Sequence, residues 1–147
     1  MSVNSGEIME TPFEIIDHTA DIGIAVQGST LKHLFENAAV GLFSMITDLT
    51  AVEDSIEYPI NISSDTKENL LVDWLNELIY VYEVEHIIFK HFNINILSDT
   101  ALEALCFGDS LNNKRHLIKR EVKAATYHML SITNDINGFH ATVIFDI

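Results

Sequence analysis

The chain has 147 residues, of which 48% are hydrophobic and 20% charged, and its formal net charge is −14. These values predict one globular domain and exclude an intrinsically disordered chain. They also argue against nucleic-acid binding over a broad surface, because carboxylates repel phosphates. No apolar run reaches the roughly 20 residues of a membrane-spanning helix, so no membrane partner is expected.

The start of the chain and its cysteine content bear on its compartment. Residues 1–11 are polar and acidic, which predicts a flexible tail rather than a secretory signal. Cys106 is the single cysteine, so the chain forms neither an internal disulfide nor a zinc cluster built on cysteines. We therefore expect a cytoplasmic protein with one domain over residues 1–147.

Apolar periodicity predicts the elements of the first half. Alternation indicates strands at about 13–17 and 22–26, and helical spacing predicts a helix over 30–48 that Ser29 or Thr30 caps. A strand at 56–63 contains Pro59, which is typical of a sheet edge. Residues 65–68 have the form of a capping box, with Asp65 as the cap of a second helix over about 66–84.

Strands dominate the prediction for the second half. They are expected at about 87–97, 101–107, 122–134 and 139–146, with a polar, basic loop over 108–121. Asn137-Gly138 predicts a tight hairpin between the last two strands. Two long helices among many hairpin-connected strands favour an α+β two-layer sandwich. Its sheet would be mixed but mostly antiparallel, with both helices on one face.

Acidic residues near the two chain ends are the main candidates for chemistry. Asp17, His18 and Asp21 lie in a break between two strands, and Asp146 is followed by the terminal carboxylate on Ile147. Carboxylates that a fold brings together repel one another unless a cation or protons intervene. If these segments meet, their oxygen atoms suit Ca²⁺, Mg²⁺ or Mn²⁺, and His18 would shift the preference toward a transition metal. Taken alone, Asp17 is more typical of a turn residue and Asp146 of an ordinary exposed acid at a chain end.

Basic residues gather near the C-terminal end. Residues 114–123 contain five of the chain's eight Lys and Arg residues. This run is typical either of a solvated loop or of a strip that contacts RNA or an acidic protein. Lys123 lies just after the loop, where it would pair with the carboxylates or hold an anionic ligand.

Four motifs together resemble the archease family. They occur in family order over about residues 13–147. The motifs are Asp17-His18-Thr19-Ala20-Asp21-Ile22-Gly23, Trp74-Leu75-Asn76-Glu77-Leu78, Glu121-Val122-Lys123-Ala124-Ala125-Thr126-Tyr127-His128 and Ile144-Phe145-Asp146-Ile147.

The resemblance implies a small α+β protein that serves RtcB-type RNA ligases in tRNA splicing and RNA repair. Such proteins are not themselves catalytic; they promote guanylylation of the ligase and its repeated turnover. The resemblance assigns Asp21, Asp146 and the Ile147 carboxylate to a divalent-metal site, with Ca²⁺ as the expected ion. It counts Lys123 among the functional residues, with Asp17 and His18 as further candidates. RNA would be contacted only weakly or through the ligase.

Two other functions stay open on the residues alone. The same carboxylates would serve a metal-dependent phosphoester hydrolase, although His18 is the sole nearby candidate for a base. Alternatively, the acids only solvate one edge of a non-catalytic, chaperone-like binding module.

Overall fold

The computed structural model describes residues 11–17 and 21–147, and the predicted N-terminal tail lies almost wholly outside them. The strands of the first half are β1 (Phe13–Asp17), β2 (Asp21–Gly28) and β3 (Ile56–Ser63). The helices are α1 (Leu31–Ile46), the 3-10 helix η1 (Leu49–Ala51) and α2 (Lys67–Glu85). The later strands are β4 (Ile87–Leu97), β5 (Ala101–Ser110), β6 (Ala124–Thr126), β7 (Thr133–Asp135) and β8 (Gly138–Asp146).

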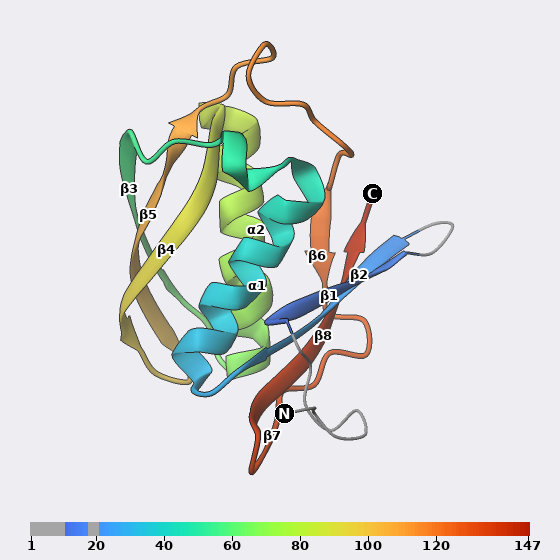
Figure 1. Cartoon of the computed structure of the whole chain (residues 1–147). Helices are drawn as coiled ribbons and strands as arrows, with labels where there is room; N and C mark the ends of the chain where they lie inside the picture. The colour runs from blue at the N-terminus through green and yellow to red at the C-terminus, as the bar shows by residue number, and fades with distance from the viewer. Residues whose placement is uncertain (1–10, 18–20) are drawn as a thin grey trace, which may run out of the picture.

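Two sheets enclose the pair of long helices (Figure 1). One sheet has the order β1-β2-β8-β6, with β7 also paired to β8, and the other has the order β3-β5-β4. Every strand pair within residues 11–17 and 21–147 is antiparallel. The predicted α+β class is therefore confirmed, whereas the expectation of one sheet with both helices on one face is wrong.

The burial of α1 explains why there are two sheets. Nine of its 16 residues are buried, and they include adjacent ones such as Ala38-Ala39 and Leu42-Phe43. A helix that is apolar on more than one side needs packing partners on more than one side. On one side of α1, the rings of Phe43 and of Phe89 from β4 meet edge to face, with 5.7 Å between their centroids. On the other side, Ile24 and Phe13 of the first sheet pack against Gly41.

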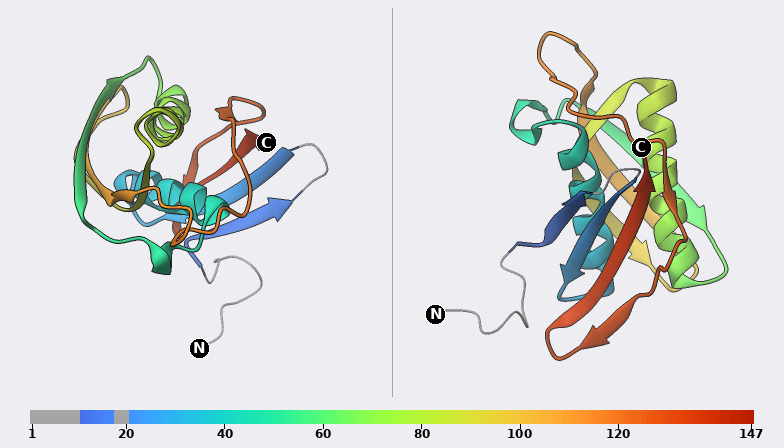
Figure 2. Two further views of the ribbon diagram at one scale, coloured as in Figure 1. Left: turned by 90° about the horizontal axis from the view of Figure 1, so that it is seen from above. Right: turned by 90° about the vertical axis from the view of Figure 1, so that its right-hand side faces the viewer.

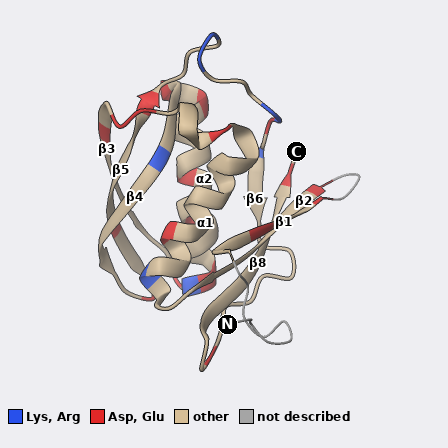
Figure 3. Ribbon diagram, viewed as in Figure 1, with Lys and Arg blue, Asp and Glu red and all other residues tan. Residues whose placement is uncertain are grey.

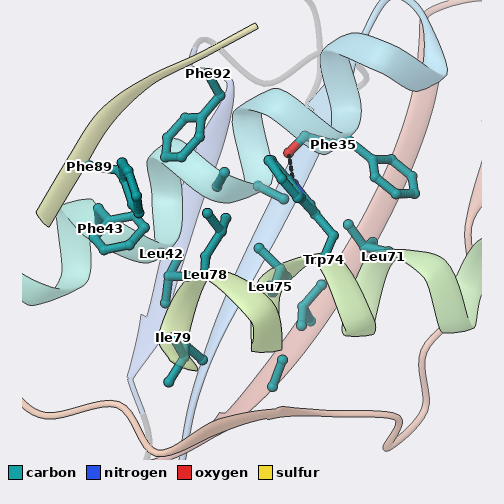
Figure 4. Packing of buried hydrophobic residues seen from close by; sticks show 14 of the residues in the cluster. Phe35, Leu42, Phe43, Leu71, Trp74, Leu75, Leu78, Ile79, Phe89 and Phe92 are labelled. Carbon is teal, nitrogen blue, oxygen red and sulfur yellow. Dashed lines mark hydrogen bonds between the residues drawn. The ribbon is translucent and has the colours of Figure 1, made fainter. Parts of the chain in front are cut away.

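Buried hydrophobic side chains pack between the two helices (Figure 4). Trp74 of α2 is fully buried, and its indole N–H donates to the carbonyl of Phe35 on α1 at 3.0 Å. The edge of its ring meets Phe92 of β4 at 5.9 Å between centroids. This contact joins α2 to both α1 and the β3-β5-β4 sheet.

Most predicted boundaries of the elements are confirmed to within a few residues. The strands at 13–17, 56–63 and 87–97 are confirmed at both ends, and β3 with Pro59 lies at a sheet edge. Thr30 caps α1 by accepting the His33 N–H at 3.1 Å. The capping box with Asp65 is wrong, because Thr66 is the cap of α2 and Asp65 accepts the side-chain amide of Asn69 instead.

The strand predicted over 122–134 is also wrong. It consists of two short strands, β6 and β7, separated by a turn in which the Leu130 N–H donates to the Tyr127 carbonyl at 3.2 Å. Met129 has a φ of 53° there, a left-handed conformation that interrupts a strand. The hairpin at Asn137-Gly138 is confirmed, and Gly138 is required because its φ is 117° and a Cβ would lie 2.4 Å from the Gly28 carbonyl oxygen. Among the described residues, no helix combines the length and apolarity that crossing a membrane requires.

Candidate metal centre at the tip of the sheet

Asp21 and Asp146 are direct cross-strand partners. Asp21 is the first residue of β2 and Asp146 the last of β8, and the antiparallel register pairs them. The C-terminus consequently lies beside the start of β2 at one tip of the sheet (Figure 2). Directly opposed side chains project from the same face with Cβ atoms about 4.5–5.5 Å apart. The start of β2 and the end of β8 thus lie side by side.

Burial of the neighbouring residues fixes which way the two carboxylates point. Ile22 and Phe145 pair with each other one position inward, and both are fully buried. Because strand side chains alternate between faces, Asp21 and Asp146 project from the opposite, outer face. Asp21 is half-buried there and Asp146 is exposed. The alternation of buried and exposed residues along these two strands therefore places both carboxylates on the outer face of the sheet.

Strand β6 lies on the other side of Asp146 and brings in Lys123. Ala124 is the register partner of Asp146, and the Lys123 N–H donates to the Asp146 carbonyl at 2.8 Å. The Lys123 side chain is exposed. Its amino group has no ion-pair partner within 4.0 Å among the acids of the described residues. The backbone of Lys123 is thus fixed beside the acid pair while its charge stays available.

Asn76 of α2 holds β6 in place, a role that the sequence did not reveal. Its side-chain oxygen accepts the Ala125 N–H at 2.8 Å, and its side-chain nitrogen donates to the Ala125 carbonyl at 3.1 Å. The amide therefore pairs with Ala125 as a neighbouring strand would. Helical periodicity marks Asn76 only as a polar position on α2, so its partner emerges from the tertiary structure.

Asn76→Ala is expected to loosen β6 and lower the free energy of unfolding by about 1–3 kcal/mol, because both polar groups of the buried Ala125 backbone lose this partner. Amide hydrogen exchange should rise at Ala125 and Lys123. Asn69→Ala on the same helix is the control, since its amide bonds only the exposed Asp65. Unchanged exchange at both amides in Asn76→Ala would refute this role.

Asp17 and His18 do not join the acid pair in the described structure. Asp17 pairs with Ile22, which places it on the inner face of the sheet. Its carboxylate lies 3.7 Å from the guanidinium of Arg120. His18 lies outside the described residues. Arg120 also donates to the carbonyl of Met45 at 3.4 Å, so it connects β1 to the end of α1.

The chemistry of the tip is that of oxygen donors. No group of three His, Cys, Asp or Glu side chains within residues 11–17 and 21–147 is placed to hold a metal ion. The described side-chain donors are therefore the two carboxylates of Asp21 and Asp146, with the Ile147 main chain directly beyond them. Two opposed carboxylates that pair with no Lys, Arg or His of the described chain fit a hard divalent cation that completes its coordination with water or with a partner's oxygen atoms.

A buried ionic cluster holds the basic segment that leads to this tip. We call residues 111–123 the basic strap. Asp109 at the end of β5 is 5% exposed and pairs with Arg115 at 2.7 Å. The ring of His116, 1% exposed, accepts the Asn112 N–H on Nδ1 at 2.9 Å. Its Nε2 lies 3.3 Å from the Asp109 carboxylate, outside hydrogen-bond geometry.

Asp109→Asn is expected to destabilise the protein at neutral pH but not in acid. Burial raises the pKa of the Asp109 carboxyl, but the hydrogen bond from the Glu53 N–H and the charge of Arg115 outweigh it, so the net pKa is lowered. A lowered pKa stabilises the fold above the ordinary Asp pKa and ceases to do so as pH falls through the folded value. Urea unfolding should show a loss of about 1–3 kcal/mol at pH 7 that begins to shrink below about pH 4, the ordinary Asp pKa, and disappears only below the lowered pKa of the folded state.

The exposed Asp54, replaced by asparagine, is the control for that measurement, and its stability should follow the wild type at both pH values. A loss in Asp109→Asn that is equally large in acid would show that the carboxylate charge is not the cause.

The fold and the paired acids define a class of small α+β proteins with a carboxylate tip, and comparison with known proteins identifies the family. Residues 13–147 match the model of the archease protein family. The protein archease of Methanosarcina barkeri is 36% identical over 139 residues, covering 92% of this chain and 95% of that protein. That of Saccharolobus islandicus is 42% identical over 137 residues, covering 92% and 98%. The chain belongs to the archease family.

Solved structures agree with this assignment. The solution structure of protein 1598 from Methanobacterium thermoautotrophicum has a TM-score of 0.80 and 36% identity, with 92% of this chain and 99% of that chain covered. The crystal structure of an archease from Thermotoga maritima, described as a possible chaperone, has a TM-score of 0.64 and 22% identity. At that identity the second likeness supports the fold alone.

Proposed function

We propose that this protein is a non-catalytic accessory factor of an RtcB-type RNA ligase. In this role it promotes guanylylation of the ligase and its repeated turnover in tRNA splicing or RNA repair. The observation that carries the proposal is the register pairing of Asp21 with Asp146, next to the backbone of Lys123. Membership of the archease family supports it.

The chemical contribution would come from the tip. Asp21, Asp146 and the main-chain carboxylate of Ile147 would hold a divalent cation, with Ca²⁺ expected from its preference for carboxylate oxygens and flexible geometry. Such a cation offsets the repulsion between the acids and supplies positive charge next to bound phosphates. Lys123 would contact an anionic group of the ligase–nucleotide complex, because its exposed amino group is not engaged by the described acids.

The test is a ligase assay with and without this protein. The ligase, GTP, a divalent metal and cleaved RNA are combined with the ligase at a concentration below that of the RNA. The protein should raise the amount of guanylylated ligase and convert a single turnover into many. An unchanged yield per ligase would refute the function. Suppressed aggregation of the ligase without added turnover would instead favour a chaperone-like role.

The Ile147 carboxylate gives a separate prediction. Ile147 is 37% exposed, so residues appended after it are expected to leave the fold intact while moving the terminal charge away from Asp146. Cation affinity by calorimetry and ligase turnover should both fall about tenfold or more, because loss of even an outer-shell partner of a metal site costs about 10–100-fold. An extension of equal length before residue 1 is the control. Equal affinity in the two extended proteins would exclude the carboxylate as a ligand.

A further inference from the structure

The basic strap reverses the charge of the rest of the chain. Residues 114–123 carry five of the eight basic residues and one acid, Glu121, whereas the other 21 acids lie elsewhere. Figure 3 shows these bases along the loop between β5 and β6, with most of the acidic positions on the body of the molecule. A charged loop whose side chains are only solvated needs no fixed conformation. The hydrogen bonds that fix this loop therefore suggest that its conformation serves a binding role.

The strap is held at both ends and in the middle. The Leu111 N–H donates to the His86 carbonyl at 2.8 Å where the strap begins, and the Lys123 N–H bonds Asp146 where it ends. Between them, the Thr47 hydroxyl donates to the Leu117 carbonyl at 2.7 Å, and the Lys119 N–H to the Ile46 carbonyl at 2.7 Å. With the buried cluster around Asp109, these bonds fix the strap across the C-terminal end of α1 before any partner arrives.

Three side chains along the fixed strap are exposed to solvent. Lys114 and Lys119 are exposed, and Leu117 between them is 79% exposed. Neither lysine forms an ion pair within 4.0 Å with an acid of the described residues, although the charge of Lys119 reaches Asp48 at longer range. An apolar side chain flanked by available positive charges has the composition of a protein interface, in which an apolar anchor lies inside a charged rim.

We propose that the basic strap docks onto an acidic protein surface, with Leu117 seated in an apolar recess between carboxylates that pair with Lys114 and Lys119. The features of the strap favour a protein over an RNA strand. Residues 111–123 contain no Phe, Tyr or Trp on which bases would stack, and 21 acids on the remaining chain repel phosphates. Under the proposed function, on which this inference rests, the surface belongs to the ligase.

Docking through the strap would also orient the acid pair. The last residues of the strap join the tip through Arg120 to Asp17 at 3.7 Å and through the Lys123 N–H to Asp146. A partner bound to Lys114, Leu117 and Lys119 would thus meet Asp21 and Asp146 at one edge of its interface. The strap would supply affinity and direction, and the tip would supply the chemistry.

Two charge-reversal variants with the same net charge test this proposal. Lys114→Glu/Lys119→Glu changes the strap, and Lys32→Glu/Lys67→Glu changes the first turns of α1 and α2 as the matched control. Binding to the ligase is measured by surface plasmon resonance at low and physiological ionic strength, with circular dichroism to verify folding. The strap variant should bind at least about tenfold more weakly, chiefly through a slower and less salt-dependent association rate. The control should bind within about twofold of the wild type.

Leu117→Ser tests the apolar anchor without changing charge. It should raise the dissociation rate and leave the association rate and its salt dependence nearly unchanged. A fluorescent single-stranded RNA is measured against every variant in parallel. Weaker RNA binding by the strap variant, with ligase binding retained, would identify an RNA surface and overturn the proposal.

The remaining outcomes separate this proposal from the proposed function. Equal losses in both charge variants would show an effect of net charge alone and overturn the docking role. Wild-type stimulation of the ligase, with all strap variants binding normally, would overturn the docking role and leave the accessory function intact. Strap-dependent binding without any stimulation of the ligase would support the docking role and overturn the accessory function.

Discussion

Alanine in place of Asp21 or Asp146 is expected to abolish cation binding at the tip and the stimulation of the ligase, while the fold remains intact. Both residues lie at strand ends with side chains on the outer face, so their removal creates no cavity in the core. Each substitution removes one of the two side-chain donors. Calorimetric affinity for Ca²⁺ or Mn²⁺ should fall by about two orders of magnitude or more, because loss of even an outer-shell partner costs about 10–100-fold.

Thermal stability gives this prediction a readout independent of the ligase. Like charges directly opposed on neighbouring strands destabilise a sheet by about 0.2–1 kcal/mol. In the presence of a chelator, the alanine variants should therefore be as stable as the wild type or slightly more stable. Added metal should stabilise the wild type by about 2.7 kcal/mol at 100 times its dissociation constant and leave both variants unchanged.

The exposed Asp54, far from the tip in sequence and located before β3, is the matched control when replaced by alanine. It should retain both the metal-dependent stabilisation and the ligase turnover. Full ligase stimulation by Asp21→Ala and Asp146→Ala, with normal folding, would refute the functional assignment of the acid pair.

Trp74→Ala is expected to have the largest effect on stability, about 3–5 kcal/mol, as for removal of a fully buried aromatic side chain. The indole contacts α1 through the Phe35 carbonyl and the second sheet through the ring of Phe92. Its loss would leave both a cavity and an unpaired buried carbonyl at the junction of three elements. Equilibrium unfolding in urea, followed by circular dichroism, measures the change.

Trp74→Phe separates the two contributions. It keeps a ring in the core but removes the N–H donor, so the Phe35 carbonyl loses its partner at a cost of about 1–3 kcal/mol. Phenylalanine should therefore recover part of the loss seen with alanine. A phenylalanine variant as unstable as the alanine variant would assign the whole effect to the hydrogen bond, contrary to the packing in Figure 4.

The secondary structure followed from sequence wherever one period dominates. Alternation located β1 and β3, and the helical spacing of apolar residues located α1 and α2. The prediction failed over 122–134, because the left-handed residue Met129 interrupts the chain in a segment without Gly or Pro to signal a turn. It also missed the second sheet, since periodicity shows that α1 is strongly apolar but not how many partners cover it.

The residues of the candidate site could likewise be found in part from the sequence and in part only from the tertiary structure. The sequence by itself determined which acids, lysine and bases are present, that Asp21 lies at a break beside a strand while Asp146 ends one, and, through its motifs, that the chain resembles the archease family. Tertiary structure alone decided that these two strands are neighbours in register, because strand order depends on long-range packing around α1. It also decided that Asn76 clamps β6 and that Asp109 with His116 fixes the basic strap, since both contacts join residues whose partners local sequence patterns do not specify.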